Sequence, residues 1–129
     1  MEDAPSILVI DDSQVLRKII EICLQREGYR VTSFADPVVA LRDLFVTQTV
    51  ALPDLFIVDI GLPHLDGYDV IKRLRKKHKQ TPIIAISGRD GVLDRLKARL
   101  AGANVYLTKP FRTQELVALV QQLLSQRDG

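Results

Sequence analysis

Five short runs of apolar and β-branched residues alternate along the chain with five longer segments in which apolar residues recur every three or four positions. The short runs are residues 7–10, 31–34, 55–59, 82–87 and 104–108. Their length and composition are typical of β-strands, and the longer segments have the period of amphipathic helices. Five successive βα units predict an α/β fold, in which a doubly wound parallel sheet carries helices on both faces.

Apolar residues at helical spacing mark the five expected helices. They are Val15, Ile19 and Ile22; Val39, Leu41, Leu44 and Phe45; Val70, Ile71 and Leu74; Leu93, Leu96 and Leu100; and Leu116, Leu119, Val120 and Leu123. Gly28 and Gly102 predict the ends of the first and fourth helices, because glycine readily adopts the left-handed conformation that commonly follows a helix. Asp36 is placed to cap the second helix, and Thr113 to cap the fifth, with Glu115 in its first turn.

The length and composition bound the class of protein. We expect a single domain over the 129 residues, with a core over about residues 6–125. No apolar run approaches the roughly 18–20 residues of a membrane span, and the N-terminus lacks the segments of a signal peptide. The single cysteine, Cys23, allows no internal disulfide. This fits a reducing compartment, although cysteine-poor chains also occur elsewhere, and we predict a cytoplasmic protein that binds no membrane.

The charges are unevenly distributed along the chain. Residues 1–60 hold ten acids and five bases, whereas residues 61–129 hold six acids and thirteen bases. The densest basic run is "KRLRKKHK", residues 72–79. It could form a nucleic-acid or partner patch, or a solvated helix end, where cations are favoured by the helix dipole. We favour the solvated helix end and predict no direct nucleic-acid binding, since no aromatic residue is interleaved to stack on nucleotides.

Chemically active residues follow four of the five expected strands. The first strand ends in Asp11 and Asp12, the third in Asp59, the fourth in Ser87 and the fifth in Lys109. Ligands of such sheets bind at the carboxyl ends of the strands, so these side chains should meet at one edge. Each could instead be a helix cap or an ordinary boundary residue, but the combination favours a site.

Three converging carboxylates would repel one another, and a hard divalent cation relieves the repulsion. Mg²⁺ prefers oxygen ligands and typically takes one or two protein carboxylates together with a phosphate oxygen. A lysine and a hydroxyl nearby supply a cation and a hydrogen-bond donor for a phosphoryl group. These groups together suit phosphoryl transfer onto a carboxylate.

The sequence resembles the receiver domain of two-component response regulators from residue 7 to about residue 124. The motifs that carry the resemblance are "VIDDS", "VDIGLPHLDGYDV", "AISG" and "YLTKPF", in this order and at βα spacing. The resemblance implies a flavodoxin-like sheet with strand order 2-1-3-4-5. It also implies a protein that is not an enzyme acting on a separate substrate, but one that catalyses its own phosphorylation and dephosphorylation.

The resemblance implies a role for each residue of the site. Asp59 would be the phosphoacceptor and would form an acyl phosphate. Asp12 would bind Mg²⁺ directly and Asp11 largely through water, while Gly61 would contribute its backbone carbonyl. Lys109 would pair with the phosphoryl group.

The resemblance also implies a conformational switch. Ser87 would move to bond the phosphoryl group, and Tyr106 would then turn inward. The peptide bond before Pro110 would be cis, and Pro63 and Gly67 would shape the loop that starts the third helix. Ser87 stands where threonine is commoner in the family, so the hydroxyl is kept and a restraining methyl is lost.

The implied partners are a histidine kinase or histidine phosphotransfer protein, and a downstream effector or an output domain outside this chain. The readout surface would be formed by the fourth helix, fifth strand and fifth helix, and a homodimer could form through the same face. Its candidate members, which could equally be solvated surface residues, are Arg95, Lys97, Arg99, Arg112 and Gln122. The sequence leaves open whether the chain is a whole single-domain regulator or part of a larger protein.

Three other functions deserve comparison with this one. A Mg²⁺-dependent phosphohydrolase with an aspartyl nucleophile usually has a second Asp two positions after the first, where this chain has Gly61. A receiver-like interaction module that is not phosphorylated usually lacks an acid or the lysine, whereas all are present here. A nucleotide-binding protein would need a glycine-rich loop after the first strand, and none follows it.

Overall fold

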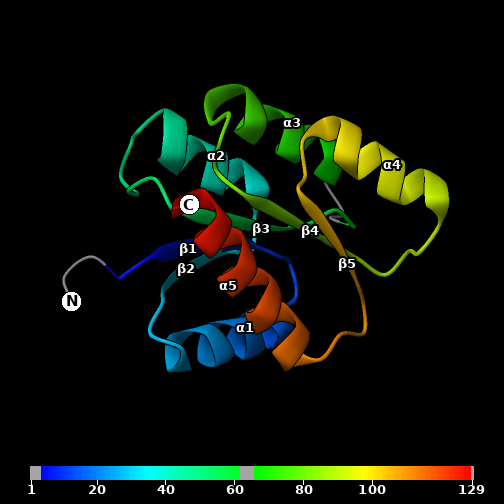
Figure 1. The fold of residues 1–129 in the computed structure, drawn as a ribbon. Coiled ribbons are helices and arrows are strands. Elements are labelled where there is room, and N and C mark those ends of the chain that lie inside the picture. Colours follow the sequence, from blue (N-terminus) through cyan, green and yellow to red (C-terminus); the bar gives the residue numbers. More distant parts are fainter. Residues whose placement is uncertain (1–3, 62–65, 129) are drawn as a thin grey trace.

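The computed structural model describes residues 4–61 and 66–128, which form five strands and five helices in strict alternation (Figure 1). The elements in chain order are β1 (Ser6–Ile10), α1 (Gln14–Arg26), β2 (Arg30–Phe34), α2 (Pro37–Phe45), β3 (Leu55–Asp59), α3 (Gly67–Lys77), β4 (Ile83–Ser87), α4 (Val92–Ala101), β5 (Val105–Thr108) and α5 (Thr113–Asp128). Each strand begins and ends within one residue of its predicted limits. None of the helices in this described part has both the length and the apolar character of a bilayer span.

The strands form one parallel sheet in the order β2-β1-β3-β4-β5, which confirms the expected topology. The strands β3 and β4 are buried along their whole length, and β1 is buried after its first residue. The edge strands β2 and β5 are more exposed. The three central strands β1, β3 and β4 therefore place their carboxyl ends side by side, in the middle of the sheet.

Helices cover both faces of the sheet (Figure 1). The strand residues Ile7, Val9 and Ile57 share a core with α1 and α5. Alternate residues, such as Leu8 and Val58, share a second core with α2, α3 and α4. This two-residue alternation follows from the strand pleat, and it explains why the central strands are apolar throughout.

The helix limits agree with the predicted caps at three of four positions. Gly28 and Gly102 have φ angles of 91° and 127° after α1 and α4, and the Asp36 side chain accepts a hydrogen bond from the Val38 N–H at 2.8 Å. The predicted Thr113 cap is wrong by one residue. The helix α5 already includes Thr113, because the first helical hydrogen bond, from the Leu116 N–H, reaches the carbonyl of residue 112.

Two helices expose the apolar residues that mark them in the sequence. On α1 these are Val15, Ile19 and Ile22, and on α4 they are Leu93, Leu96 and Leu100. The buried residues are instead Ile20 and Leu24 on α1, and Ala98 and Ala101 on α4. Small alanine side chains allow α4 to lie close to the sheet while its leucines face outward.

Candidate functional site

Three carboxylates meet at the carboxyl ends of β1 and β3. Asp11, Asp12 and Asp59 each place one carboxylate oxygen within 4.8 Å of the others. This follows from the pairing of β1 with β3, in which Ile10 lies opposite Val58. Asp11 and Asp59 are buried, whereas Asp12 is exposed.

Asp11 is held by the start of α1. Its Oδ1 accepts a hydrogen bond from the Ser13 N–H at 2.9 Å, while Ser13 caps the helix by accepting from the Leu16 N–H at 3.1 Å. Its Oδ2 is buried, lies 3.9 Å from the Lys109 Nζ, and accepts no hydrogen bond from the residues that the structure describes. Burial and then the Asp59 charge raise the pKa of Asp11 to about 6, against the opposing effects of the Ser13 N–H and Lys109.

Both oxygens of Asp59 have a donor. The Gly61 N–H donates to Oδ1 at 2.8 Å, and the Lys109 Nζ donates to Oδ2 at 2.8 Å. Lys109 follows β5, and its side chain remains 30% exposed while the Asp59 side chain is 4% exposed. The peptide bond between Lys109 and Pro110 is cis. The lysine thus reaches from the mouth of the site to the buried carboxylate.

The backbone after Asp59 packs tightly on the first residue of α3. A Cβ on Gly67 would lie 2.2 Å from the Ile60 Cα, so only glycine fits there without movement of the backbone. A Cβ on Gly61 would lie 3.4 Å from the Asp59 Oδ1, which is an ordinary contact. The predicted loop residue Pro63 lies outside the described residues.

Ser87 and Tyr106 converge on the backbone of Arg89. The buried Ser87 Oγ accepts a hydrogen bond from the Arg89 N–H at 3.0 Å, and the Tyr106 hydroxyl donates to the Arg89 carbonyl at 2.7 Å. The Arg95 guanidinium lies 5.0 Å from the centroid of the Tyr106 ring. One loop residue therefore links the end of β4 to the aromatic side chain on β5.

Comparison with known proteins shows the family. A model described as the response regulator receiver domain matches residues 7–121. This chain is a response regulator receiver domain. It belongs to a family whose members act with histidine kinases and effectors in two-component signalling, and it is a phosphoacceptor domain of that kind.

Curated relatives of the receiver domain include both short and long proteins. It is 36% identical to the protein PilG of Pseudomonas aeruginosa over 121 residues, which cover 92% of this chain and 87% of PilG. It is 34% identical over 123 residues to the virulence transcriptional regulatory protein PhoP of Salmonella typhimurium, covering 95% of this chain and 53% of PhoP. The chain therefore spans about half the length of PhoP.

Solved structures show the same fold. A putative response regulator from Chloroflexus aurantiacus superposes with a TM-score of 0.85 at 34% identity, over 95% of this chain and 98% of that one. The BeF3-activated receiver domain of DrrB also superposes with a TM-score of 0.85, at 27% identity and over the same shares of the two chains.

The acidic residues of this receiver domain fit a hard divalent cation. They offer only oxygen atoms, which such cations prefer, and the buried Oδ2 of Asp11 lacks a hydrogen-bond donor among the described residues. A buried carboxylate oxygen without a donor is unfavourable. A bound cation would satisfy it.

The structure also shows contacts that the sequence did not predict. Arg95 was expected on a readout surface, yet it binds Asp90, and its Nη2 donates to the Thr108 Oγ1 at 3.0 Å. The hydrogen bond and the charge of Arg95, together with a hydrogen bond from the Thr108 hydroxyl, lower the pKa of Asp90. The five predicted readout residues are all exposed. Only the i, i+5 spacing of Asp90 and Arg95 could have indicated the pair, and such spacing is weak evidence.

Proposed function

We propose that Asp59 accepts a phosphoryl group from the phosphohistidine of a histidine kinase or histidine phosphotransfer protein, in a reaction that requires Mg²⁺. The observation that carries the proposal is the setting of Asp59. It is a buried carboxylate fixed by Gly61 and Lys109, beside the oxygens of Asp11 and Asp12. A carboxylate held in this way is positioned to act as a nucleophile.

The step forms a bond between an Asp59 oxygen and phosphorus as the bond between phosphorus and the donor imidazole nitrogen breaks. The imidazole leaves with its electron pair and takes a proton from water. Lys109 stabilises the negative charge on the transferred group. Ser87 supplies a hydroxyl that donates to a phosphoryl oxygen after it releases the Arg89 N–H.

We propose that Asp11, Asp12, Asp59 and the Gly61 carbonyl hold the Mg²⁺, with Asp12 in direct contact. When bound, the cation would neutralise charge on the transferring phosphoryl group. Gly61 and Lys109 orient the Asp59 acceptor through their hydrogen bonds to its two oxygens.

Phosphorylation then biases the Ser87–Tyr106 pair. Moving Ser87 removes one of the two groups that hold the Arg89 backbone, and this would free Tyr106 to turn inward. The change reaches the face formed by α4, β5 and α5, where an effector or a second copy would bind. A single receiver domain over residues 1–129 and a cytoplasmic location remain our predictions from the sequence.

The direct test is to incubate the protein with acetyl phosphate, with and without Mg²⁺, and to record its intact mass. We expect one added phosphoryl group that requires Mg²⁺ and is lost in Asp59→Asn. The matched control is Asp36→Asn, which preserves the α2 cap and should be phosphorylated normally. No mass gain with any donor would indicate an interaction module, and donor turnover without a trapped adduct would indicate a phosphohydrolase.

A further inference from the structure

A groove of about 600 Å³ runs between α2 and α3, away from the acidic site. Its apolar lining comes from α2 and the residue that follows it, and consists of Val38, Leu41, Phe45 and Val46. Leu41 and Phe45 also pack on the core, whereas Val38 and Val46 are 58% and 76% exposed. Apolar side chains thus lie open to solvent in a concave surface, which is typical of a docking site.

Cations border this groove. The lining residues include Arg42 of α2 and, from α3, Arg73, Lys76 and Lys77, with no acid among them. Arg42 pairs with Asp43 at 3.1 Å. Within the described residues, none of the three α3 cations forms an ion pair. The groove therefore presents apolar side chains beside unneutralised positive charge.

The basic run of residues 72–79 thus divides into two groups. Arg75 turns inward, and its guanidinium donates to the Gly102 carbonyl at 2.8 and 3.1 Å and to the Asn104 Oδ1 at 2.9 Å. The neighbours Arg73, Lys76 and Lys77 are exposed and line the groove. Solvation of a helix end alone does not explain why these cations lie beside exposed apolar side chains.

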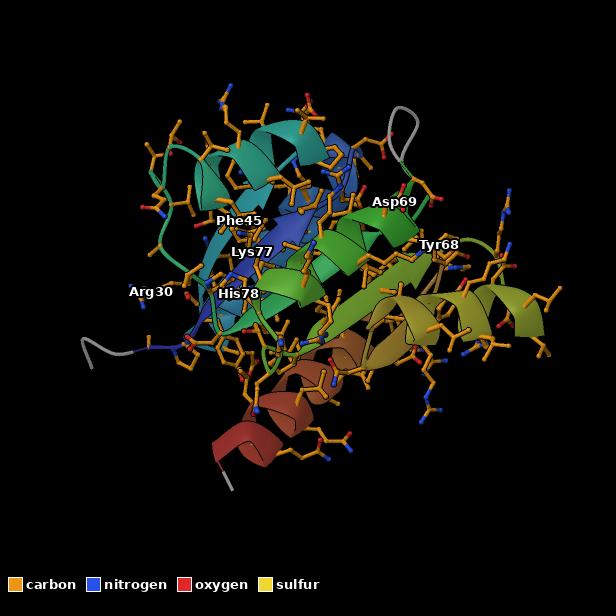
Figure 2. All side chains as sticks on the ribbon, turned by 90° about the horizontal axis from the view of Figure 1, so that it is seen from above. Arg30, Phe45, Tyr68, Asp69, Lys77 and His78 are labelled. Carbon is orange, nitrogen blue, oxygen red and sulfur yellow. The ribbon has the colours of Figure 1, made fainter. Side chains whose placement is uncertain are left out.

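The surface continues past the end of α2. A second hollow of about 440 Å³ shares Phe45 and Lys77 with the groove and extends to His78 and Leu52. Leu52 is 57% exposed. Figure 2 labels Phe45, Lys77 and His78 together at one end of α3, whereas Tyr68 and Asp69 lie at its other end. The apolar surface is therefore longer than the groove alone.

We propose that the α2–α3 groove binds an amphipathic helix of a partner protein, whose apolar face is flanked by acidic residues. Helices commonly dock in apolar grooves through residues spaced three and four apart. The three free cations favour acidic flanks, and rim charges of this kind contribute specificity and association rate. No residue of α4, β5 or α5 lines the groove, so the proposed partner would bind apart from the readout face.

Charge and shape distinguish this occupant from two others. A second copy of the chain offers the exposed leucines of α4, but that helix carries Arg95, Lys97 and Arg99 against one acid, Asp94, and the cations of the groove would repel it. An anionic membrane would meet the same cations, but a bilayer surface does not fill a concave groove between two helices.

The test is selection from a displayed library of helical peptides, each about 16 residues or 24 Å long. The positions i, i+3, i+4 and i+7 are apolar, and the flanking positions are randomised among Glu, Lys and Gln. We expect the 129-residue protein to enrich peptides with Glu flanks. Amide chemical shifts of the labelled protein should place the selected peptide on α2 and α3.

The variant Arg73→Glu/Lys76→Glu should weaken the selected peptide at least about tenfold. The matched control, Lys97→Glu/Arg99→Glu on α4, changes the net charge equally and should leave the affinity within about twofold. Both variants change exposed residues, and circular dichroism and Mg²⁺-dependent phosphorylation check that each is folded. Retained affinity in the groove variant, or equal loss in the control, would overturn the proposal.

Four other outcomes would also overturn it. Three are the absence of charge selection in the enriched peptides, a footprint on α4 or α5, and displacement of the peptide by vesicles of phosphatidylglycerol and phosphatidylcholine in about equal parts. The last result would assign the groove to a membrane surface. Concentration-dependent dimerisation lost in the groove variant would assign it to a second copy.

Discussion

At the carboxyl end of the sheet Asp11 and Asp59 are buried together beside one cation, Lys109. At the amino end the half-buried His78 packs against two aromatic rings, with centroids 5.4 Å from Phe45 and 6.0 Å from Phe56, and its Nε2 atom is buried. One buried oxygen at the first end and one buried nitrogen at the second have no hydrogen-bond partner among the described residues. Each end thus has a buried polar atom without a hydrogen-bond partner, but the oxygen lies among charged groups and the nitrogen lies beside aromatic rings.

The difference is whether the buried group carries a charge. A neutral imidazole can remain between aromatic rings at modest cost, and its stacking stabilises the fold. Two neighbouring carboxylates cannot both remain ionised without a cost that a ligand could offset. We therefore expect a bound cation to stabilise the first end, and the second end to stabilise the fold without one. Four experiments test this comparison.

The largest effect on stability is expected at Gly67, where the start of α3 packs closely on the backbone that follows Asp59. In Gly67→Ala the new Cβ would lie 2.2 Å from the Ile60 Cα, and the backbone would have to shift. We expect a loss of about 3 kcal/mol in unfolding free energy, measured by urea denaturation. The control is Gly61→Ala, two residues after the end of β3, where the Cβ meets an atom only at 3.4 Å. Equal losses in the two variants would show that the close approach is not a constraint.

Removing the exposed acid Asp12 should weaken metal binding and leave folding almost unchanged. Asp12→Ala should weaken Mg²⁺ binding about tenfold or more, or about 1.4 kcal/mol, as measured by calorimetry. The unfolding free energy of the metal-free protein should change by less than about 0.5 kcal/mol, because the substitution also relieves repulsion. Asp69→Ala, on the first turn of α3, is the control and should leave Mg²⁺ affinity unchanged. Marked unfolding of metal-free Asp12→Ala would show that this acid is a structural cap.

The amino-acid pattern predicts much of this arrangement, and the reason is the periodicity of the strands. Runs of β-branched residues fix the strands, and the parallel topology then brings Asp11, Asp59 and Lys109 to one edge. The exposed faces of α1 and α4 could not be predicted, because Leu93 and its neighbours satisfy the helical period equally well. The buried face of α4 consists of alanines such as Ala98, whose apolar signal is weak.

The remaining contacts depend on where distant loops meet in space. Ser87 and Tyr106 both bind the backbone of Arg89, and no residue type at position 89 encodes a backbone contact. The partial burial of His78 depends on Phe45, the last residue of α2, which stacks on the imidazole just beyond the end of α3. Its place in a basic run gave no indication of an aromatic environment.

The two ends should respond to pH in opposite directions. Burial and Asp59 raise the pKa of Asp11 to about 6, so its contribution to stability is present below about pH 4 and lost as the pH rises through 6. Burial, and then the charges of Arg75 and Lys77, lower the pKa of His78 from its usual 6.5. Its contribution is therefore present above pH 6.5 and lost as the pH falls below that value.

Urea unfolding of the metal-free protein between pH 4 and 8 should therefore show both effects. Each changes the unfolding free energy by at most about 1.4 kcal/mol for every unit by which the pKa differs between the folded and unfolded protein. Asp11→Asn should remove the loss on the alkaline side, and His78→Phe should reduce the loss on the acidic side. Saturating Mg²⁺ should suppress the first effect and leave the second. If Mg²⁺ shifts both, the two ends are coupled and the comparison fails.

The smallest effect concerns the lifetime of the phosphorylated state. A Cβ on Gly61 would lie 3.4 Å from the Asp59 Oδ1, so a larger side chain there would cover the acceptor. We hypothesise that glycine admits water to the acyl phosphate, and that Gly61→Asn lengthens its lifetime about threefold, which corresponds to less than about 1 kcal/mol in the barrier. The decay is followed by intact mass after the donor is removed. Gly88→Asn is the control, because a Cβ there would meet no atom within 4 Å. An unchanged lifetime in Gly61→Asn, or equal lengthening in both variants, would mean that water access at position 61 does not set the rate.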